Sequence, residues 1–216
     1  MTLDFEALEE NGFCLTSSIY ENDVIGLVQQ LGSIRVDARS PEPIRAIRPQ
    51  TAQTAKSNTL SSRYGTGCFP FHTDTAHWEQ PARYLLLFCV SPGRGMRPTF
   101  LQDSRLWQLD DAEENLACRA LWAVGHRRPR LATIATRSSG RLTIRYDMDC
   151  MRPMTAEAYQ LKELLEGRIG IQPSIRIDWK AGSLLTIDNY RMVHARGDAV
   201  QPDPDRLLKR ILVGGD

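Results

Sequence analysis

The chain has 216 residues, of which 42% are hydrophobic and 25% are charged, and its formal net charge is +1. This composition is typical of an ordinary globular protein, and the near-zero charge excludes both a strongly basic nucleic-acid binder and an acidic tail for a basic partner. The N-terminal stretch lacks the basic and apolar regions of a signal peptide, and the longest apolar run, residues 84–90, is too short to span a bilayer. We therefore expect a cytosolic protein that binds neither nucleic acid nor membrane. The sequence identifies no oligomer interface.

The first elements are short, and the pattern then changes to strands. We predict a helix over residues 5–10 that stops at Gly12, a strand over 13–15, and a second helix over 24–31 that stops at Gly32. The following short apolar runs are separated by Gly or Pro, which is typical of strands. These predicted strands cover residues 34–36, 44–47, 83–90, 99–102, 142–146, 175–179, 184–187 and 207–213.

Two helices interrupt the predicted strands. One is capped by Thr155 and runs to about Gly167, and a weaker one lies between residues 110 and 122. Many short strands with few helices favour a mainly β fold with flanking helices, built as a double-sheet jelly roll. We interpret residues 1–216 as a single domain, with an N-terminal helix and strand cap over about 1–32 and the jelly-roll core over 33–216.

The cysteines predict no structural or metal-binding role. There are five of them, widely spaced and without a Cys-x-x-Cys pair, which argues against a disulfide scaffold and a thiolate zinc site. We expect free thiols that pack as small hydrophobic side chains.

The stretch FPFHTDTAHW, residues 69–78, contains the first candidate site. His72 and Asp74 are separated by one residue, so on a strand both side chains would face the same side. Two imidazoles and a carboxylate on one side of an ion, with the other positions open, are the ligands of non-haem Fe(II) oxygenases. An isolated His-x-Asp pair often arises by chance, and it could also be a polar strand edge that contains a histidine.

A second histidine would complete this ligand set, and the chain has four in all. His194 is the best candidate, because it follows a predicted turn at residues 188–189 and could return antiparallel to the first motif. His126 is followed by two arginines, which is a poor setting for a cation.

Three stretches occur in an order that matches one known family. They are FHTDT (71–75), AGSLLTIDNYRMVHAR (181–196) and RLLKRILVGGD (206–216). They resemble the His-Thr-Asp metal motif, the Gly-x-Leu…Asp-Asn…His segment and the closing strand of the taurine dioxygenase / TfdA-like family of Fe(II)- and 2-oxoglutarate-dependent dioxygenases. Thr99 lies where this family has a threonine beside the cosubstrate. The likeness extends over about residues 13–216.

The resemblance implies a double-stranded β-helix, that is, a jelly-roll or cupin-like core. It implies that His72, Asp74 and His194 bind Fe(II), and that Thr99 and Arg206 bind the distal carboxylate of 2-oxoglutarate, for which a guanidinium fork is well suited. With O2 as oxidant, such an enzyme oxidises a C–H bond of a small molecule, most simply by hydroxylation, and releases succinate and CO2.

The resemblance also suggests substrate contacts. Arg210 matches the position that holds the substrate's anionic group in taurine-type enzymes, which implies a carboxylate-bearing substrate; it could equally support Arg206 or pair with a structural acid. His77 and Arg83 follow the metal motif and could face the substrate, although His77 could also face solvent. We expect Asp188 and Asn189 to brace the turn before His194.

Several alternatives remain open. Desaturation or ring closure would use the same iron chemistry. A cupin-like metal protein that does not use 2-oxoglutarate would not need Thr99 and Arg206, and a non-catalytic binding protein would keep only the fold. The stretch GRGMRPT, residues 93–99, replaces the family's Gly-Gly-Asp/Glu-Thr turn, and Phe71 replaces a common Trp. These departures leave the pocket and the substrate open more than the metal site.

Overall fold

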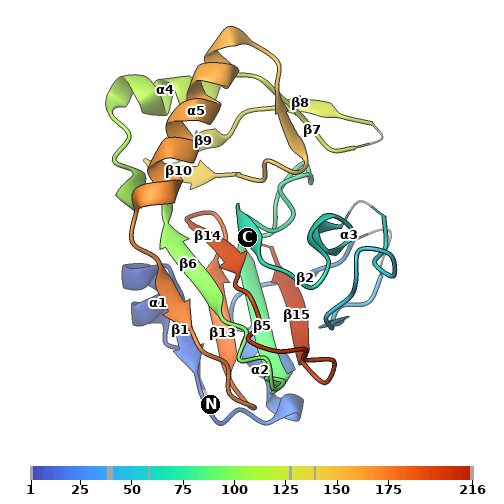
Figure 1. The fold of residues 1–216 in the computed structure, drawn as a ribbon. Coiled ribbons are helices and arrows are strands. Elements are labelled where there is room, and N and C mark those ends of the chain that lie inside the picture. The colour runs from blue at the N-terminus through green and yellow to red at the C-terminus, as the bar shows by residue number, and fades with distance from the viewer. Residues whose placement is uncertain (1, 38–40, 58, 127, 139, 215–216) are drawn as a thin grey trace.

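Two antiparallel sheets form the larger part of the molecule (Figure 1). The computed structural model describes residues 2–37, 41–57, 59–126, 128–138 and 140–214. The major sheet has the order β1–β13–β5–β15–β2, with β3 also paired to β15, and the minor sheet has the order β12–β6–β14–β4. The major strands are β1 (Phe13–Thr16), β2 (Ile34–Arg35), β3 (Arg45–Ile47), β5 (Tyr84–Ser91), β13 (Leu184–Asp188) and β15 (Leu207–Val213), and the minor strands are β4 (Phe69–His72), β6 (Thr99–Asp103), β12 (Ile175–Ile177) and β14 (Met192–Arg196). This arrangement confirms the mainly β jelly-roll core with flanking helices.

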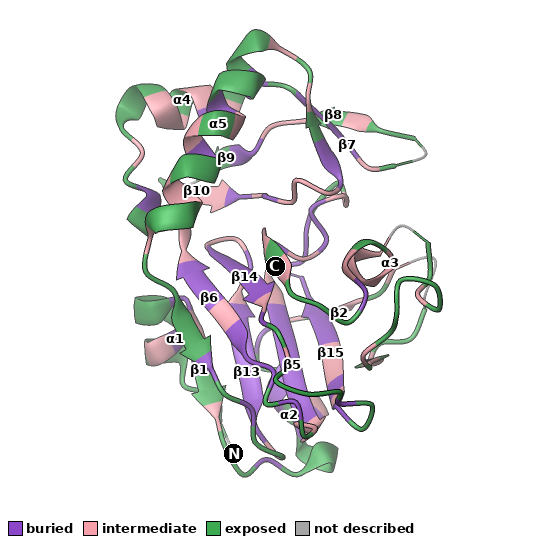
Figure 2. Ribbon diagram, in the orientation of Figure 1, coloured by how far each residue is buried: buried purple, intermediate pink, exposed green. Residues whose placement is uncertain are grey.

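The central strand β5 is buried on both faces, which explains its unbroken apolar run. Leu85 and Leu87 point between the sheets, where they pack in one core cluster with Leu101 of the minor sheet. Leu86 and Phe88 point the other way, into the cluster formed with the N-terminal helices α1 (Phe5–Asn11) and α2 (Val24–Val28). The turn η1 (Glu21–Asp23) leads into α2. The strands at the centre of the sandwich are accordingly coloured as buried in Figure 2.

Residues 104–172, between β6 and β12, form a second layer above the sandwich (Figure 1). Their buried cluster, which includes Trp107, Trp122 and Leu161, also contains Ala76 and Val193 from the two predicted metal-binding segments. The insertion therefore packs directly on the backbone that carries the candidate site. Its elements are η2 (Ser104–Trp107), α4 (Asp111–Arg119), β7 (Trp122–Val124), β8 (Arg130–Ala132), β9 (Ala135–Ser138), β10 (Arg141–Ile144), β11 (Met151–Pro153) and α5 (Ala156–Ile171).

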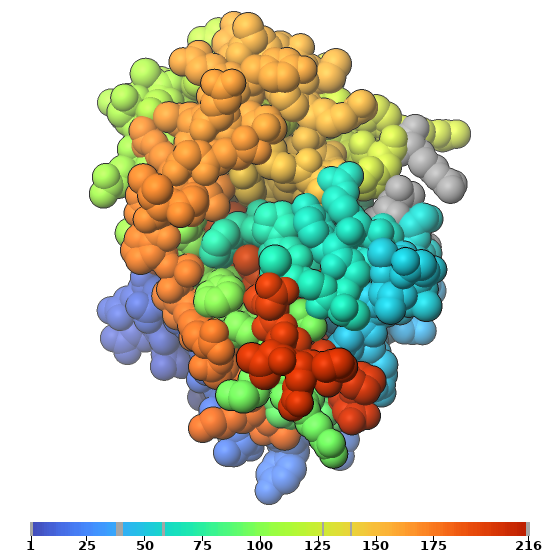
Figure 3. Space-filling view, in the orientation of Figure 1, coloured from blue at the N-terminus to red at the C-terminus, as the bar shows by residue number. Residues whose placement is uncertain are grey.

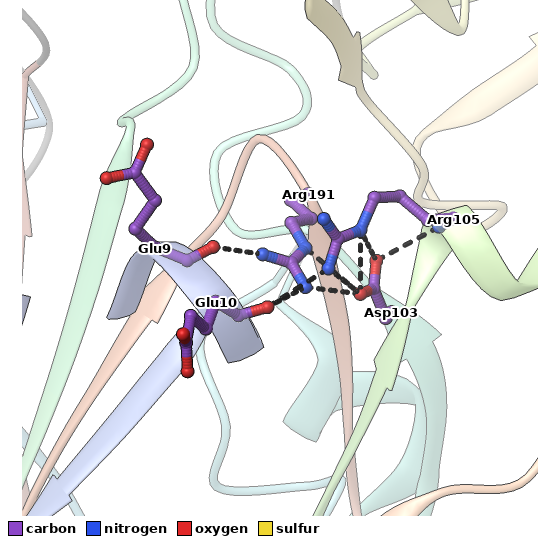
Figure 4. A network of polar contacts seen from close by, with 5 residues as sticks. All are labelled: Glu9, Glu10, Asp103, Arg105 and Arg191. Carbon is purple, nitrogen blue, oxygen red and sulfur yellow. Dashed lines mark hydrogen bonds and ion pairs between the residues drawn. The ribbon is translucent and has the colours of Figure 1, made fainter. Parts of the chain in front are cut away.

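A charged network fastens α1 to the strands that carry the site (Figure 4). Arg191, just before β14, donates hydrogen bonds to the backbone carbonyls of Glu9 and Glu10, both at 2.8 Å. It also donates to the Asp103 carboxylate at the end of β6, at 2.6 Å. Arg105 shares the same carboxylate at 2.9 Å. One carboxylate therefore joins η2, β6 and the turn that leads into β14.

Some predicted boundaries were wrong. The helix predicted over 24–31 ends at Val28, and α5 continues past Gly167 to Ile171, because a single helical glycine costs only about 1 kcal/mol relative to alanine. The helix predicted to reach residue 122 ends at Arg119, and the buried Trp122 starts β7 instead. The short helix α3 (Leu60–Tyr64) and strands β7, β8, β9 and β11 were not predicted.

The cysteines are free thiols, as predicted. Cys14, Cys89 and Cys150 are buried and Cys118 is half-buried, whereas Cys68 is exposed and does not pack as a core residue. In the part of the chain that the structure describes, no helix has the length and apolar character needed to cross a membrane.

Candidate active site

Strands β4 and β14 bring the two histidines of the predicted metal site together. They pair antiparallel with His72 directly opposite His194, and the two ring centroids lie 4.2 Å apart. Both side chains are buried. His72 Nδ1 lies 3.0 Å from the Pro70 carbonyl oxygen. Since a carbonyl oxygen only accepts, Nδ1 is the donor in this contact, and Nε2 is the ring nitrogen left to face a metal ion.

Asp74 reaches the same place from a turn, not from a strand. The expectation of a shared strand face was wrong, because β4 ends at His72. Asn189 holds the turn: its Oδ1 accepts from the Asp74 amide at 2.7 Å, and its Nδ2 donates to the Asp74 carbonyl at 3.0 Å and to the Ala82 carbonyl at 2.8 Å. Asn189 is fully buried, so it braces Asp74 directly as well as lying in the turn before β14.

Thr75 keeps the metal-motif turn in an unusual backbone conformation. Its φ of 57° lies in the left-handed region, which a β-branched residue rarely adopts. Its hydroxyl donates to the Asp74 carbonyl at 2.6 Å and accepts from the Ala82 amide at 2.8 Å. Such strain persists only where surrounding contacts impose it, and it is common at functional sites.

The charges around this turn favour an ionised carboxylate at Asp74 and a neutral imidazole at His194. Arg210 Nη1 donates to both Asp74 oxygens, at 3.0 and 3.2 Å. Burial alone would raise the pKa of Asp74, but Arg210, together with His194 and His72, lowers it to about 2. Burial and the neighbouring His72 lower the pKa of His194 to about 3. At neutral pH the site therefore presents a carboxylate beside an uncharged imidazole, which are the forms that bind metal.

The donor set fits a divalent iron ion, with one rearrangement. The Nδ1 of His194 is buried and has no hydrogen-bond partner among the described residues. Within the ranges that the structure describes, however, no three His, Cys, Asp or Glu side chains are grouped closely enough to hold a metal. The Asp74 carboxylate is bonded to Arg210, so metal binding requires it to exchange the guanidinium for the ion.

A second cluster of buried polar residues lies at the start of β15. Arg206 directly precedes the strand, and only 4% of the residue is exposed. Its Nε has no partner in the described part of the chain, and its guanidinium carbon lies 6.0 Å from the ring centroid of Trp179. Trp179 donates to the Thr99 hydroxyl at 3.1 Å. The structure thus gathers Thr99 and Arg206 around one indole ring and leaves the Thr99 hydroxyl proton free to donate.

Arg97 is a further buried arginine of this cluster, and the sequence did not indicate it. Its guanidinium donates to the Gly197 carbonyl at 3.0 Å and to Asp203 at 3.4 Å. Burial, followed by the nearby charge of Arg97, lowers the pKa of Arg206, whereas Asp203 raises it. Two buried guanidinium groups thus face one carboxylate, which leaves a net positive charge that an anionic ligand would neutralise. The one feature of the sequence that could have indicated Arg97 is that the stretch GRGMRPT, residues 93–99, differs from the family's Gly-Gly-Asp/Glu-Thr turn.

The loop that contains Asp203 folds over the loop between β5 and β6. Val200 donates its amide to the Gly95 carbonyl at 2.9 Å, and Gln201 donates to the Arg94 carbonyl at 3.0 Å. A side chain at Gly95 would lie 2.7 Å from the Gln201 carbonyl, so the two loops need glycine to approach this closely. Figure 3 shows the late residues, in red, lying against the green ones on this face.

The structure places the remaining predicted residues differently. His77 is partly exposed, and its Nε2 lies 4.0 Å from the Asp37 carboxylate. Arg83 is not brought to the site, because its guanidinium stacks on the ring of Tyr84, 4.9 Å from the centroid, on the side of the major sheet that the N-terminal helices cover.

The fold and this geometry can be compared with known proteins. No protein-family model matches the sequence, and no curated protein does. Among solved structures, the non-heme iron oxygenase OrfP, in complex with Fe, succinate and (3S)-hydroxy-L-Arg, matches with a TM-score of 0.80 at 17% identity, over 99% of this chain and 79% of that chain. The chain has the fold of this oxygenase.

Two further oxygenase-fold matches have similar extents. Asparagine oxygenase (AsnO) matches with a TM-score of 0.76 at 17% identity, over 99% of this chain and 78% of that chain. The PvcB protein from Pseudomonas aeruginosa matches with a TM-score of 0.67 at 17% identity, over 97% of this chain and 78% of that chain. The likeness therefore extends over the whole jelly roll, including its inserted layer, with few identical residues.

Proposed function

We propose that the protein is an Fe(II)- and 2-oxoglutarate-dependent dioxygenase of the taurine dioxygenase type that hydroxylates a C–H bond of a small, carboxylate-bearing molecule. The observation that carries this proposal is the pairing of His72 with His194 next to Asp74, in a fold that OrfP shares and in which OrfP binds Fe and succinate. Bound iron with 2-oxoglutarate and O2 supplies the oxidising power, and succinate and CO2 are the by-products.

The protein's own residues would bind and orient these groups. His72, His194 and Asp74 would hold the ion, with Asn189 fixing the Asp74 backbone so that little reorganisation is needed. Arg206 and the Thr99 hydroxyl would bind the distal carboxylate of 2-oxoglutarate, because the unpaired Nε of a buried guanidinium otherwise has no partner.

The proposed substrate class has two lines of support. Among the described residues, the Arg210 guanidinium is bonded only to Asp74, and it would become available to an anion once Asp74 binds the metal. In addition, OrfP and asparagine oxygenase have been crystallised with (3S)-hydroxy-L-Arg and with 2S,3S-3-hydroxyasparagine, which favours a substrate of amino-acid type. Desaturation or ring closure of such a molecule would need the same residues.

A metal protein that does not use 2-oxoglutarate is a weaker alternative. It would leave Arg97 and Arg206 buried without an anionic ligand, with Asp203 as the one compensating carboxylate among the described residues. Burying such an uncompensated charge is costly.

Anaerobic titration with Fe(II) and then 2-oxoglutarate tests the proposal. We expect a weak visible charge-transfer band when the cosubstrate chelates the iron, and succinate formation when O2 is admitted. A protein that binds both and forms no succinate under any substrate screen would contradict the enzymatic proposal.

Variants separate the metal ligands from the cosubstrate anchor. Asp74→Ala should lose both the band and succinate formation. Arg206→Gln should keep iron binding and raise the KM for 2-oxoglutarate by about 30-fold or more, since a charge-assisted hydrogen bond contributes about 2 kcal/mol or more. Arg119→Gln, an exposed residue at the end of α4, is the matched control and should change neither property.

A further inference from the structure

Two arginines face each other across neighbouring strands at the edge of the major sheet. Arg45 of β3 is directly opposite Arg210 of β15, and Arg35 of β2 is opposite Leu212. Directly opposed residues of antiparallel strands lie on the same face with Cβ atoms about 5 Å apart, and like charges there are destabilising. Arg210 has Asp74 as a partner, but no hydrogen bond or ion pair joins Arg45 to another of the described residues.

These side chains point to the inner side of the sandwich. Leu208 and Leu212, on the same strand face as Arg210, both pack in the cluster between the sheets. Arg35, Arg45 and Arg210 line one cleft. Since Arg210 touches Asp74, this cleft opens directly beside the proposed metal site.

Positive charges outnumber negative charges among the described residues that line the cleft. Asp37 and Glu42 also line it, so three guanidinium groups face two carboxylates. Burial and then Arg210 lower the pKa of Arg45, which indicates that the two cations interact unfavourably. Arg35 also stacks on Trp78, 5.5 Å from the ring centroid, and is held at the side of the cleft. When Asp74 turns to the metal, the described residues that line the cleft carry one positive charge in excess, next to Arg45 and Arg210.

We infer that Arg45 is a second substrate-binding arginine, which holds the carboxylate of the substrate together with Arg210. This inference rests on the proposed function, because Arg210 becomes available when Asp74 binds iron. Two guanidinium groups fit the two oxygens of one carboxylate, and its charge removes the repulsion between them. The substrate therefore carries a carboxylate that lies beside β3, with the oxidised carbon nearer the iron.

Acetate and acetamide form a matched pair of probes for this cleft, since they differ in charge and share a methyl group. The protein is loaded with Zn(II), which has no redox chemistry, and with saturating 2-oxoglutarate. The methyl signal of each probe is then followed by saturation-transfer NMR at constant ionic strength. We expect saturable acetate binding and no saturable acetamide binding. Equal binding of the two probes would overturn the inference, and this comparison needs no variant to fold.

Substitutions then assign the binding to Arg45. Arg45→Gln should weaken acetate binding by about 10-fold or more, and Arg45→Lys should have an acetate affinity between those of the wild type and Arg45→Gln. Arg48→Gln, an exposed arginine just after β3, should bind like the wild type. Unchanged acetate affinity in folded Arg45→Gln would refute the assignment, including the case where acetate binds zinc alone. Succinate formation by the iron-loaded wild type is measured in parallel, so loss of the proposed function is distinguished from loss of the anion cleft.

Discussion

At the scale of single residues, Asn189 makes the contacts that fix the metal-motif turn. Its amide satisfies the backbone of Asp74 on both sides and also the carbonyl of Ala82. Asn189→Ala would leave these buried groups unpaired, at about 1–3 kcal/mol for each group that water cannot reach. We expect about 3 kcal/mol lower unfolding free energy in urea and about 10- to 100-fold weaker iron binding. Asn11→Ala, at the exposed end of α1, should change neither; iron affinity unchanged in Asn189→Ala would contradict the bracing role.

His194 gives the metal-free protein a defined acid sensitivity. Its pKa is about 3 in the folded chain and about 6.5 when unfolded, so between these values the unfolded state binds more protons. Stability should therefore fall as the pH decreases from about 6.5, and Asp74, with a folded pKa of about 2, adds to the loss below about pH 4. When the unfolding free energy is measured in urea at several pH values, its increase with pH in this range should be smaller for His194→Asn than for the wild type, by about 1.4 kcal/mol per pH unit. Exposed His126→Gln should follow the wild-type curve, and identical slopes for all three proteins would disprove the assignment.

At the scale of elements, the network around Asp103 ties α1 to β6 and β14. Arg191 and Asp103 are each only 13% exposed, whereas Arg105 on the same carboxylate is 62% exposed. Removing one partner of a buried pair costs about 3–5 kcal/mol, and an exposed pair contributes at most about 1 kcal/mol. Arg191→Met should thus lower the unfolding free energy far more than Arg105→Met. If thermal or urea unfolding showed an equal loss of unfolding free energy in both variants, burial would not determine how much each ion pair contributes to stability.

The elements that could be predicted are those with a strong local pattern. The run in β5, the closing strand β15 and the capped helix α5 were predicted because their apolar residues and caps are adjacent in sequence. The strands of the inserted layer are three or four residues long and mostly lack a clear alternation, so their existence depends on pairing with distant partners.

At the scale of the whole molecule, the proposed metal ligands come from segments far apart in the chain, around β4 and in β14, so metal binding should stabilise the whole fold. A ligand that binds only the folded state at 100 times its Kd adds about 2.7 kcal/mol, which for a chain of this size raises Tm by about 5–10 °C. Fe(II) with 2-oxoglutarate, added anaerobically, should produce such a rise, and a chelator should reverse it. His72→Ala should have no rise, and a rise retained in that variant would place the metal elsewhere.

The site itself could be predicted only in part from the sequence. The motif order predicted His72, Asp74, His194, Thr99 and Arg206. The structure places His72 opposite His194 and gathers Thr99 and Arg206 around Trp179. The motifs could not predict the hydrogen bond from Arg210 to Asp74 or the position of Arg45, because both depend on the register between strands far apart in the chain. Such registers are determined by the packing of whole sheet faces and leave no local pattern.

A structure from crystals grown without O2, in the presence of Fe(II) and 2-oxoglutarate, would decide whether the proposed metal centre binds iron. We predict iron, identified by its anomalous scattering, coordinated by His72, His194 and Asp74, with Arg210 released from the carboxylate and Arg206 on the cosubstrate. Iron bound elsewhere, or Asp74 still paired with Arg210 while both imidazoles remain unligated, would contradict the proposed metal centre.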